Sequence, residues 1–96
     1  MRESEIEKYL CKRVKTELNG RAFKWVSPGF NGVPDRIVLA PLGRTYFVEL
    51  KAPGKKMRKL QEWVARELIK LGFEHRVIDT KEKVDEFIRQ VQENEI

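Results

Sequence analysis

The sequence predicts an α/β fold in which a mixed sheet is flanked by helices. Three segments place apolar residues at every third or fourth position, which is typical of amphipathic helices. Four shorter segments are rich in β-branched and aromatic residues and are bounded by turn residues, which is typical of strands. These elements follow one another in the order α-β-β-β-α-β-α, so the last two strands are joined through a helix.

Length and composition restrict the class of protein. The 96 residues suffice for one domain with a modest core, so we expect residues 1–96 to form a single domain. Hydrophobic residues make up 41% and charged residues 36%, and no apolar run approaches the ~20 residues that a membrane span requires. Cys11 is the only cysteine, which excludes an internal disulfide and a thiolate metal cluster. The acidic N-terminus is unlike a signal peptide, so we expect an intracellular protein.

The first helix is predicted to begin at Ser4 and to end before Asn19. Ser4 as N-cap and Glu7 three residues later match a capping box. A four-residue spacing of apolar side chains predicts one buried stripe: Ile6, Leu10, Val14 and Leu18. The following strand is predicted over Ala22–Val26, and Ser27–Pro34, with two glycines and two prolines, is predicted to be a loop.

The next two strands, Arg36–Ala40 and Thr45–Leu50, are predicted to form a hairpin. Pro41-Leu42-Gly43 fits a three-residue loop, a type I turn that starts at Pro41 and has Gly43 in the left-handed conformation. Such a loop pairs Ala40 with Arg44. A slip of one residue would send every side chain to the opposite face, so the turn determines which side chains of the two strands share a face.

In this register Asp35 lies opposite Glu49, and their side chains project from one face within ~5.5 Å at Cβ. Lys51, two residues beyond Glu49, points to the same face. Mg²⁺ binds oxygen ligands and needs only one or two carboxylates, so Asp35 and Glu49 are candidate ligands, with the main-chain carbonyl of Leu50 within reach. Lys51 could orient a water, deprotonate it or stabilise the charged transition state. The alternative is a surface salt bridge between Glu49 and Lys51, with Asp35 as a cap of the loop.

A basic run adjoins this candidate site. The formal net charge is +5, and five cations fall within nine residues: Lys51, Lys55, Lys56, Arg58 and Lys59. Beside a candidate metal site, such a run favours contact with nucleic-acid phosphates over an ordinary solvated surface. Lys12, Arg13 and Lys15 form a second cluster, for which a solvated helix face is an equal alternative.

The remaining chain is predicted to form a helix over Met57–Leu71, a strand over Phe73–Ile78 and a last helix capped by Thr80. The first of these helices is predicted to stop at Gly72. Its expected buried residues are Leu60, Trp63, Val64, Leu68 and Leu71, and those of the last helix are Val84, Phe87, Ile88 and Val91. A right-handed crossover makes the fourth strand parallel to the third.

Isolated aromatic and histidine residues offer weaker signals. Trp63 belongs to a helical stripe, which favours a core residue over the alternative of a base-stacking platform. His75, the sole histidine, is predicted to be structural. Phe30, in the glycine-containing loop, is a candidate for substrate contact.

Several motifs together resemble the VRR-NUC domain family of the PD-(D/E)XK nuclease superfamily. They are Gly32-Val33-Pro34-Asp35, Glu49-Leu50-Lys51-Ala52 and Leu60-Gln61-Glu62-Trp63, followed by Gly72. The resemblance extends from Glu7 through Ile78. It implies a restriction-endonuclease-like αβββαβ core, here with a C-terminal helix added. It also implies that Asp35 and Glu49 bind Mg²⁺ or Mn²⁺ and that Lys51 is catalytic.

The resemblance assigns two further residues. Gln61 matches a glutamine that would project from the start of its helix toward the metal-site water or the scissile phosphate. Glu7 matches an acidic residue that can add to the metal site, a role that competes with its capping box. The stretch Met57-Arg58-Lys59 departs from the family because it lacks the hydroxyl residue that often starts this helix.

Short stand-alone members, of viral and bacterial type, resemble homodimeric Holliday-junction resolvases. The resemblance therefore implies a metal-dependent, structure-selective DNA endonuclease in the cytoplasm of a bacterium or an infected host cell. The alternatives are a nicking or flap nuclease without junction preference and a non-catalytic DNA-binding module.

Overall fold

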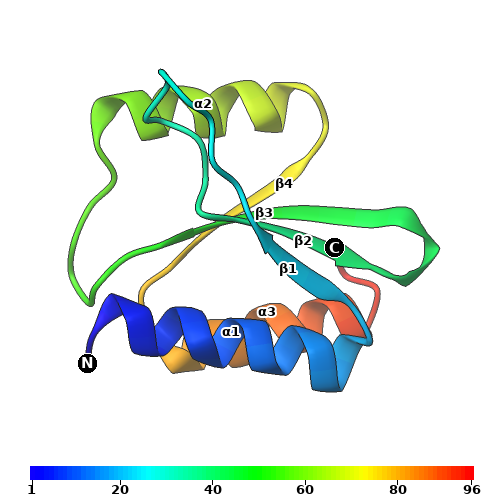
Figure 1. The fold of residues 1–96 in the computed structure, drawn as a ribbon. Helices are drawn as coiled ribbons and strands as arrows, with labels where there is room; N and C mark the ends of the chain where they lie inside the picture. The colour runs from blue at the N-terminus through cyan, green and yellow to red at the C-terminus, as the bar shows by residue number, and fades with distance from the viewer.

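The computed structural model describes residues 1–96. Its elements are, in chain order, α1 (Glu3–Leu18), β1 (Arg21–Lys24), β2 (Arg36–Ala40), the 3₁₀ turn η1 (Pro41–Gly43), β3 (Arg44–Leu50), α2 (Lys59–Lys70), β4 (Glu74–Ile78) and α3 (Lys81–Gln92). The strands form one sheet in the order β1-β2-β3-β4, antiparallel except for the parallel pair β3–β4. Helices α1 and α3 cover one face of the sheet and α2 the other (Figure 1). The predicted α/β class, element order and mixed sheet are confirmed.

The larger core lies between the sheet and the pair of helices α1 and α3. Alternate residues of β2 and β3 point to this side because side chains alternate along a strand. The predicted stripe of α1 and that of α3 are both buried here. The core consists of Ile6, Leu10, Val14, Leu18, Val38, Ala40, Tyr46, Val48, Leu50, Ile78, Val84, Phe87, Ile88 and Val91. Each large apolar side chain buried in this way contributes roughly 1.5–3 kcal/mol.

The core under α2 is smaller, and the predicted stripe of α2 is partly wrong. Only Phe47, Val64 and Leu68 form this cluster, with Trp25 and Ile37 packed against it. The exposed fractions of Leu60, Trp63 and Leu71 are 41%, 47% and 72%, although all three were predicted to be buried. Helix α2 packs against the sheet and, at its start, against the loop over residues 27–34, whereas α1 packs against both the sheet and α3, so α2 buries a narrower face.

The hairpin has the predicted register but not the predicted turn. Ala40 pairs with Arg44, and Arg36 pairs with Val48. Gly43 has the predicted left-handed conformation, with a φ of 73°. Leu42 also has a positive φ, of 69°, which a type I turn does not allow. The loop length, rather than the turn type, preserved the register.

The ends of several elements also differ from prediction; α2, for example, covers Lys59–Lys70 instead of Met57–Leu71. Helix α1 begins at Glu3, one residue before the predicted cap Ser4, and Glu7 makes an ion pair elsewhere, so the capping box is wrong. Strand β1 ends at Lys24 instead of Val26. The cap of α3 is confirmed, because the hydroxyl of Thr80 accepts a hydrogen bond from the Lys83 N–H. None of the three helices has both the length and the apolar character of a membrane span.

Candidate active site

Asp35 and Glu49 meet on the face of the sheet that α2 covers. The pairing of Arg36 with Val48 places Asp35, one residue earlier, beside Glu49, one residue later. Phe47 lies under α2, and Glu49, two residues on, points to the same side. In Figure 1 the end of β3, the first turn of α1 and the connection from β3 to α2 lie on the same side of the molecule.

Hydrogen bonds from two backbone N–H groups hold both the side chain and the main chain of Asp35 in place. Its carboxylate Oδ2 accepts a hydrogen bond from the Leu50 N–H at 2.8 Å. Its main-chain carbonyl accepts one from the Trp25 N–H at 3.0 Å. The catalytic candidate Lys51 is held in the same manner, because its N–H donates to the Ile78 carbonyl at 3.0 Å. The site therefore rests on backbone at the ends of all four strands.

Glu49 is a buried acid without a full set of partners. Its exposed fraction is 1%, so the alternative of a surface salt bridge with Lys51 is wrong. Its Oε1 atom is buried and has no hydrogen-bond partner. Burial, together with the neighbouring Asp35 carboxyl, raises the pKa of Glu49 to about 8, while the Lys51 ammonium opposes this rise. An unpartnered buried carboxylate is costly unless a cation or a proton joins it.

These features fit a divalent cation. Two carboxylates suffice for Mg²⁺, which retains water molecules for the rest of its coordination shell. No third Asp, Glu, His or Cys side chain joins the pair to form a preformed cluster. Leu50 contributes its N–H to Asp35, and the predicted use of its carbonyl as a ligand stays a prediction.

Gln61 lies in the first turn of α2 and is almost fully buried, with an exposed fraction of 7%. Its Oε1 accepts a hydrogen bond from the Arg58 N–H at 2.9 Å. Gln61 thus replaces the missing hydroxyl residue as the cap of this helix. The amide NH₂ group is the end that can meet a substrate, and that role stays a prediction.

The acidic residues of α1 are arranged differently from the prediction. Glu7 forms an ion pair with Arg36 at 2.8 Å, and Arg36 also donates to the Ala22 carbonyl. Its role at a metal site stays a prediction, since it would have to leave Arg36. Glu3, which was not among the predicted site residues, is close enough to raise the pKa of Glu49. A signal for it was present, because Glu3 and Glu7 are four residues apart on one helix, but the helix was predicted to start after Glu3.

The basic run lies along the connection from β3 to α2 and at the start of that helix. None of its five residues forms an ion pair. Arg58 donates instead to the main-chain carbonyl of Asn31, at 2.9 Å. In the second cluster Arg13 pairs with Asp85 of α3 and therefore takes part in helix packing. The five cations of the basic run have no carboxylate partner, and they follow Glu49 directly in the sequence.

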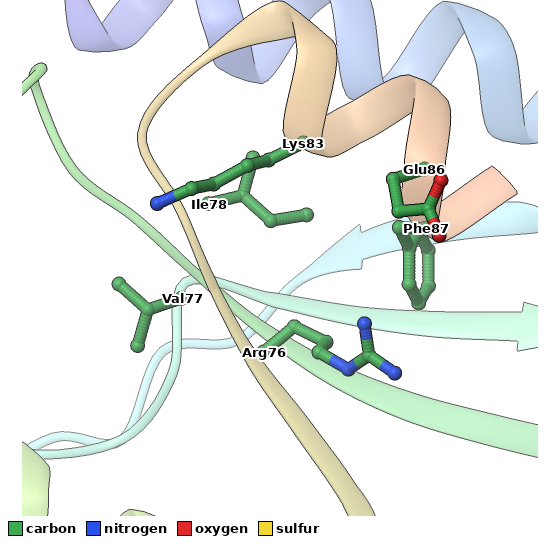
Figure 2. A pocket seen from close by; sticks show the side chains of 6 residues that line it. All are labelled: Arg76, Val77, Ile78, Lys83, Glu86 and Phe87. Atoms are coloured by element: carbon green, nitrogen blue, oxygen red, sulfur yellow. The ribbon is translucent and has the colours of Figure 1, made fainter. Parts of the chain in front are cut away.

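Other features of the structure lie outside this site. The hollow in Figure 2 lies between β4 and α3 and is lined by Arg76, Val77, Ile78, Lys83, Glu86 and Phe87. A second hollow involves Arg44, Thr45, Tyr46, Gly72, Glu74 and Ile96. Neither contains a predicted site residue. Burial lowers the pKa of His75, which pairs with Phe47 across the strands, in agreement with a structural role.

Comparisons with known proteins identify the family of this chain. No family model matches the sequence. A curated protein named "Putative nuclease p44", from Acyrthosiphon pisum secondary endosymbiont phage 1, is 44% identical over 82 residues, which cover 85% of this chain and 87% of that protein. A solved structure described as "VRR_NUC domain" matches with a TM-score of 0.84 and 30% identity, over 91% of this chain and 94% of the other. Both similarities extend over most of each protein, so the chain belongs to the VRR-NUC nuclease domain family.

Proposed function

We propose that this protein is a metal-dependent DNA endonuclease that cuts branched DNA, acting as a Holliday-junction resolvase in the form of a homodimer. The observation that supports this proposal most directly is the buried carboxylate of Glu49, whose Oε1 lacks a partner, beside the anchored carboxylate of Asp35. We propose that residues 1–96 act as one nuclease domain and that Asp35 and Glu49 hold Mg²⁺ or Mn²⁺. When bound there, the ion supplies Lewis-acid chemistry for phosphodiester hydrolysis.

Each residue of the site has a role in this proposal. Asp35 and Glu49 provide negative charge, and burial makes the charge of Glu49 unfavourable until a cation arrives. Lys51 places a positive charge beside Glu49, where it can orient the attacking water or stabilise charge on the phosphate in the transition state. In this proposal the amide NH₂ of Gln61, at the start of α2, donates to the scissile phosphate. Glu3 and Glu7 are candidates for an additional carboxylate near the ion.

DNA is the proposed substrate because the cations next to the site have no carboxylate partners. Lys55, Lys56 and Lys59 are exposed, and each can neutralise a phosphate of the backbone. A relative encoded by a phage is named a nuclease, and DNA that replicates and recombines passes through branched intermediates. The cytoplasm of a bacterium is accordingly the proposed site of action.

The homodimer is proposed because a four-way junction has approximate two-fold symmetry and must be cut twice. A symmetric dimer presents one site to each of the two cleavage positions. The face of the sheet beside α2 also carries exposed apolar side chains, with exposed fractions of 56% at Phe23 and 41% at Leu39. A partner subunit covering them would add stability. Phe23→Glu should then shift the mass measured by sedimentation toward that of a monomer.

The decisive experiment compares cleavage of an end-labelled four-way junction with that of a matched linear duplex. Mg²⁺ or Mn²⁺ is added, and Asp35→Asn serves as the control. Paired symmetric cuts confined to the junction, and absent from the control, are the expected result. Equal cutting of both substrates would leave a nicking or flap nuclease, and the absence of any metal-dependent cutting would leave a DNA-binding module.

A further inference from the structure

A loop over residues 27–34 lies against the first two turns of α2. Gly32 sits directly on Leu60, so close that a Cβ at Gly32 would lie 2.6 Å from the Leu60 Cγ atom. Arg58 donates a hydrogen bond to the Asn31 carbonyl at 2.9 Å. Phe30 packs on Trp63, with 6.4 Å between ring centroids and an interplanar angle of 56°. Three contacts thus hold two aromatic rings together.

Both rings remain open to solvent. Trp63 is 47% exposed and Phe30 is 37% exposed, and Leu60 beside them is 41% exposed. Large aromatic side chains usually bury most of their surface when no ligand or partner needs it. An exposed aromatic pair held by specific contacts is therefore a candidate binding surface.

The surroundings of the pair are basic. Lys59 precedes Trp63 by four residues and Arg66 follows it by three, so both are its neighbours on the helix surface. Both are exposed, and neither forms an ion pair. Glu62 is an exposed acidic neighbour, whereas Glu67 is paired with Lys70. Aromatic rings among free cations are the combination that binds unpaired nucleotides, by stacking on the bases and attracting the phosphates.

The pair also lies near the proposed site of cleavage. Phe30 is five residues before Asp35, so the two Cα atoms are at most about 18 Å apart. That distance corresponds to about five steps along one DNA strand. Trp63 follows Gln61 by two residues on α2. A base within a few nucleotides of the scissile phosphate can therefore reach the pair.

We infer that Phe30 and Trp63 form a stacking surface for unpaired or end-of-duplex nucleobases, and that this surface favours branched DNA over continuous duplex. In an intact duplex each base is covered on both faces by its neighbours, so an aromatic side chain finds no free face. At a branch point, a flap or an end, a face is exposed. This inference rests on the proposed function, because it names the feature of the DNA that the same site would select.

The test measures binding without metal, so that cleavage does not interfere. The chain has two tryptophans, so Trp25→Phe leaves Trp63 as the single fluorescent reporter. DNA with a single-stranded flap should quench the emission of Trp63, whereas plain duplex should leave it unchanged. With affinity measured by fluorescence anisotropy of labelled DNA, Trp63→Ala and Phe30→Ala should each weaken flap binding at least about fivefold and leave duplex binding unchanged, because one stacked base contributes about that factor. Trp63→Phe should largely restore binding.

A matched control comes from the other end of the same helix. Ile69 is an exposed apolar residue of α2, with an exposed fraction of 57%, but it lies away from the aromatic pair. Ile69→Ala should therefore change neither the affinity for flap DNA nor that for duplex DNA. The inference would be overturned if Trp63→Ala weakened flap and duplex binding equally. It would also be overturned if Trp63→Ala changed neither affinity. A change of Trp63 emission with protein concentration alone would assign the pair to a subunit interface instead.

The experiments can show that the stacking surface fails while the proposed nuclease function stands, or the reverse. If Asp35→Asn abolishes cleavage while Trp63→Ala leaves the preference for branched DNA intact, the nuclease stands and the stacking surface fails. If no substrate is cut but flap DNA quenches Trp63, the stacking surface stands and the endonuclease fails. If no DNA binds at all, both fail.

Discussion

The carboxylate of Asp35 accepts a hydrogen bond from the main-chain N–H of Leu50, at a distance of 2.8 Å. This bond joins the loop before β2 to the end of β3, and it holds Asp35 beside Glu49. One oxygen of Asp35 is thereby used for positioning, which leaves its other oxygen for a cation. The same side chain therefore has two separable roles, and two substitutions can distinguish them.

Asp35→Asn and Asp35→Ala remove the same charge but differ in hydrogen bonding. The amide oxygen of asparagine can still accept from Leu50, whereas alanine cannot. We expect Asp35→Ala to be less stable than Asp35→Asn by about 0.5–1.5 kcal/mol in urea unfolding, the net contribution of a hydrogen bond. Both should lose at least tenfold in Mn²⁺ affinity, measured by calorimetry. Equal stability of the two variants would show that the bond to Leu50 does not hold the loop.

The pH dependence of stability should report on Glu49. Burial raises its pKa from 4.5 to about 8, so folding takes up a proton between these values. The metal-free protein should lose stability as pH rises through this window, by a total on the order of 4 kcal/mol. Added Mg²⁺ should stabilise the protein more at pH 8 than at pH 5, because the ion needs the ionised acid.

Glu49→Gln provides the control for this pH dependence. Unfolding is measured in chelator at several pH values, and the variant should lack the decline that the unmodified protein shows. Burial lowers the pKa of His75, which makes stability increase as pH approaches 6.5 from below. Both proteins retain His75, so their difference isolates Glu49. An identical decline in Glu49→Gln would contradict the prediction.

The parts of the fold that local rules govern could be predicted from the sequence. The length of the hairpin loop determined the pairing of Ala40 with Arg44, and this register brought Asp35 beside Glu49 although the turn type was wrong. The stripe of α1 was predicted because the sheet and α3 together cover it. The stripe of α2 was not, because the sheet and the loop over residues 27–34 cover only part of that helix and leave Trp63 exposed.

The parts that depend on tertiary pairing could not be predicted. Glu7 had two proposed roles, but the structure joins it to Arg36, a residue of a distant strand. No local rule decides which cation a helix carboxylate will meet. Glu3 was missed because α1 was predicted to start after it, and its relation to Glu49 also depends on how α1 crosses the end of β3.

The basic connection should contribute to DNA affinity through phosphate contacts. Lys55→Ala with Lys56→Ala should weaken binding and lower the slope of log K against log salt by about 1.8, if each lysine neutralises one phosphate. The control is the double variant Lys12→Ala with Lys15→Ala, which removes two positive charges from α1 instead. Binding is measured by fluorescence anisotropy at several salt concentrations. An unchanged slope, or an equal change in the control, would show that these contacts do not lie beside the site.

The contact between Gly32 and Leu60 should couple loop position to activity. A methyl group at Gly32 would lie 2.6 Å from Leu60 Cγ and 3.0 Å from the Leu60 carbonyl oxygen, so Gly32→Ala must displace the loop that leads to Asp35. We expect a loss of about 1–3 kcal/mol in stability, as for other overpacked contacts, together with lower cleavage. Leu60→Ala removes the closest atom, so the double variant Gly32→Ala with Leu60→Ala should recover part of both losses. Strictly additive losses would show that the two residues act independently and that the loop is positioned by its other contacts.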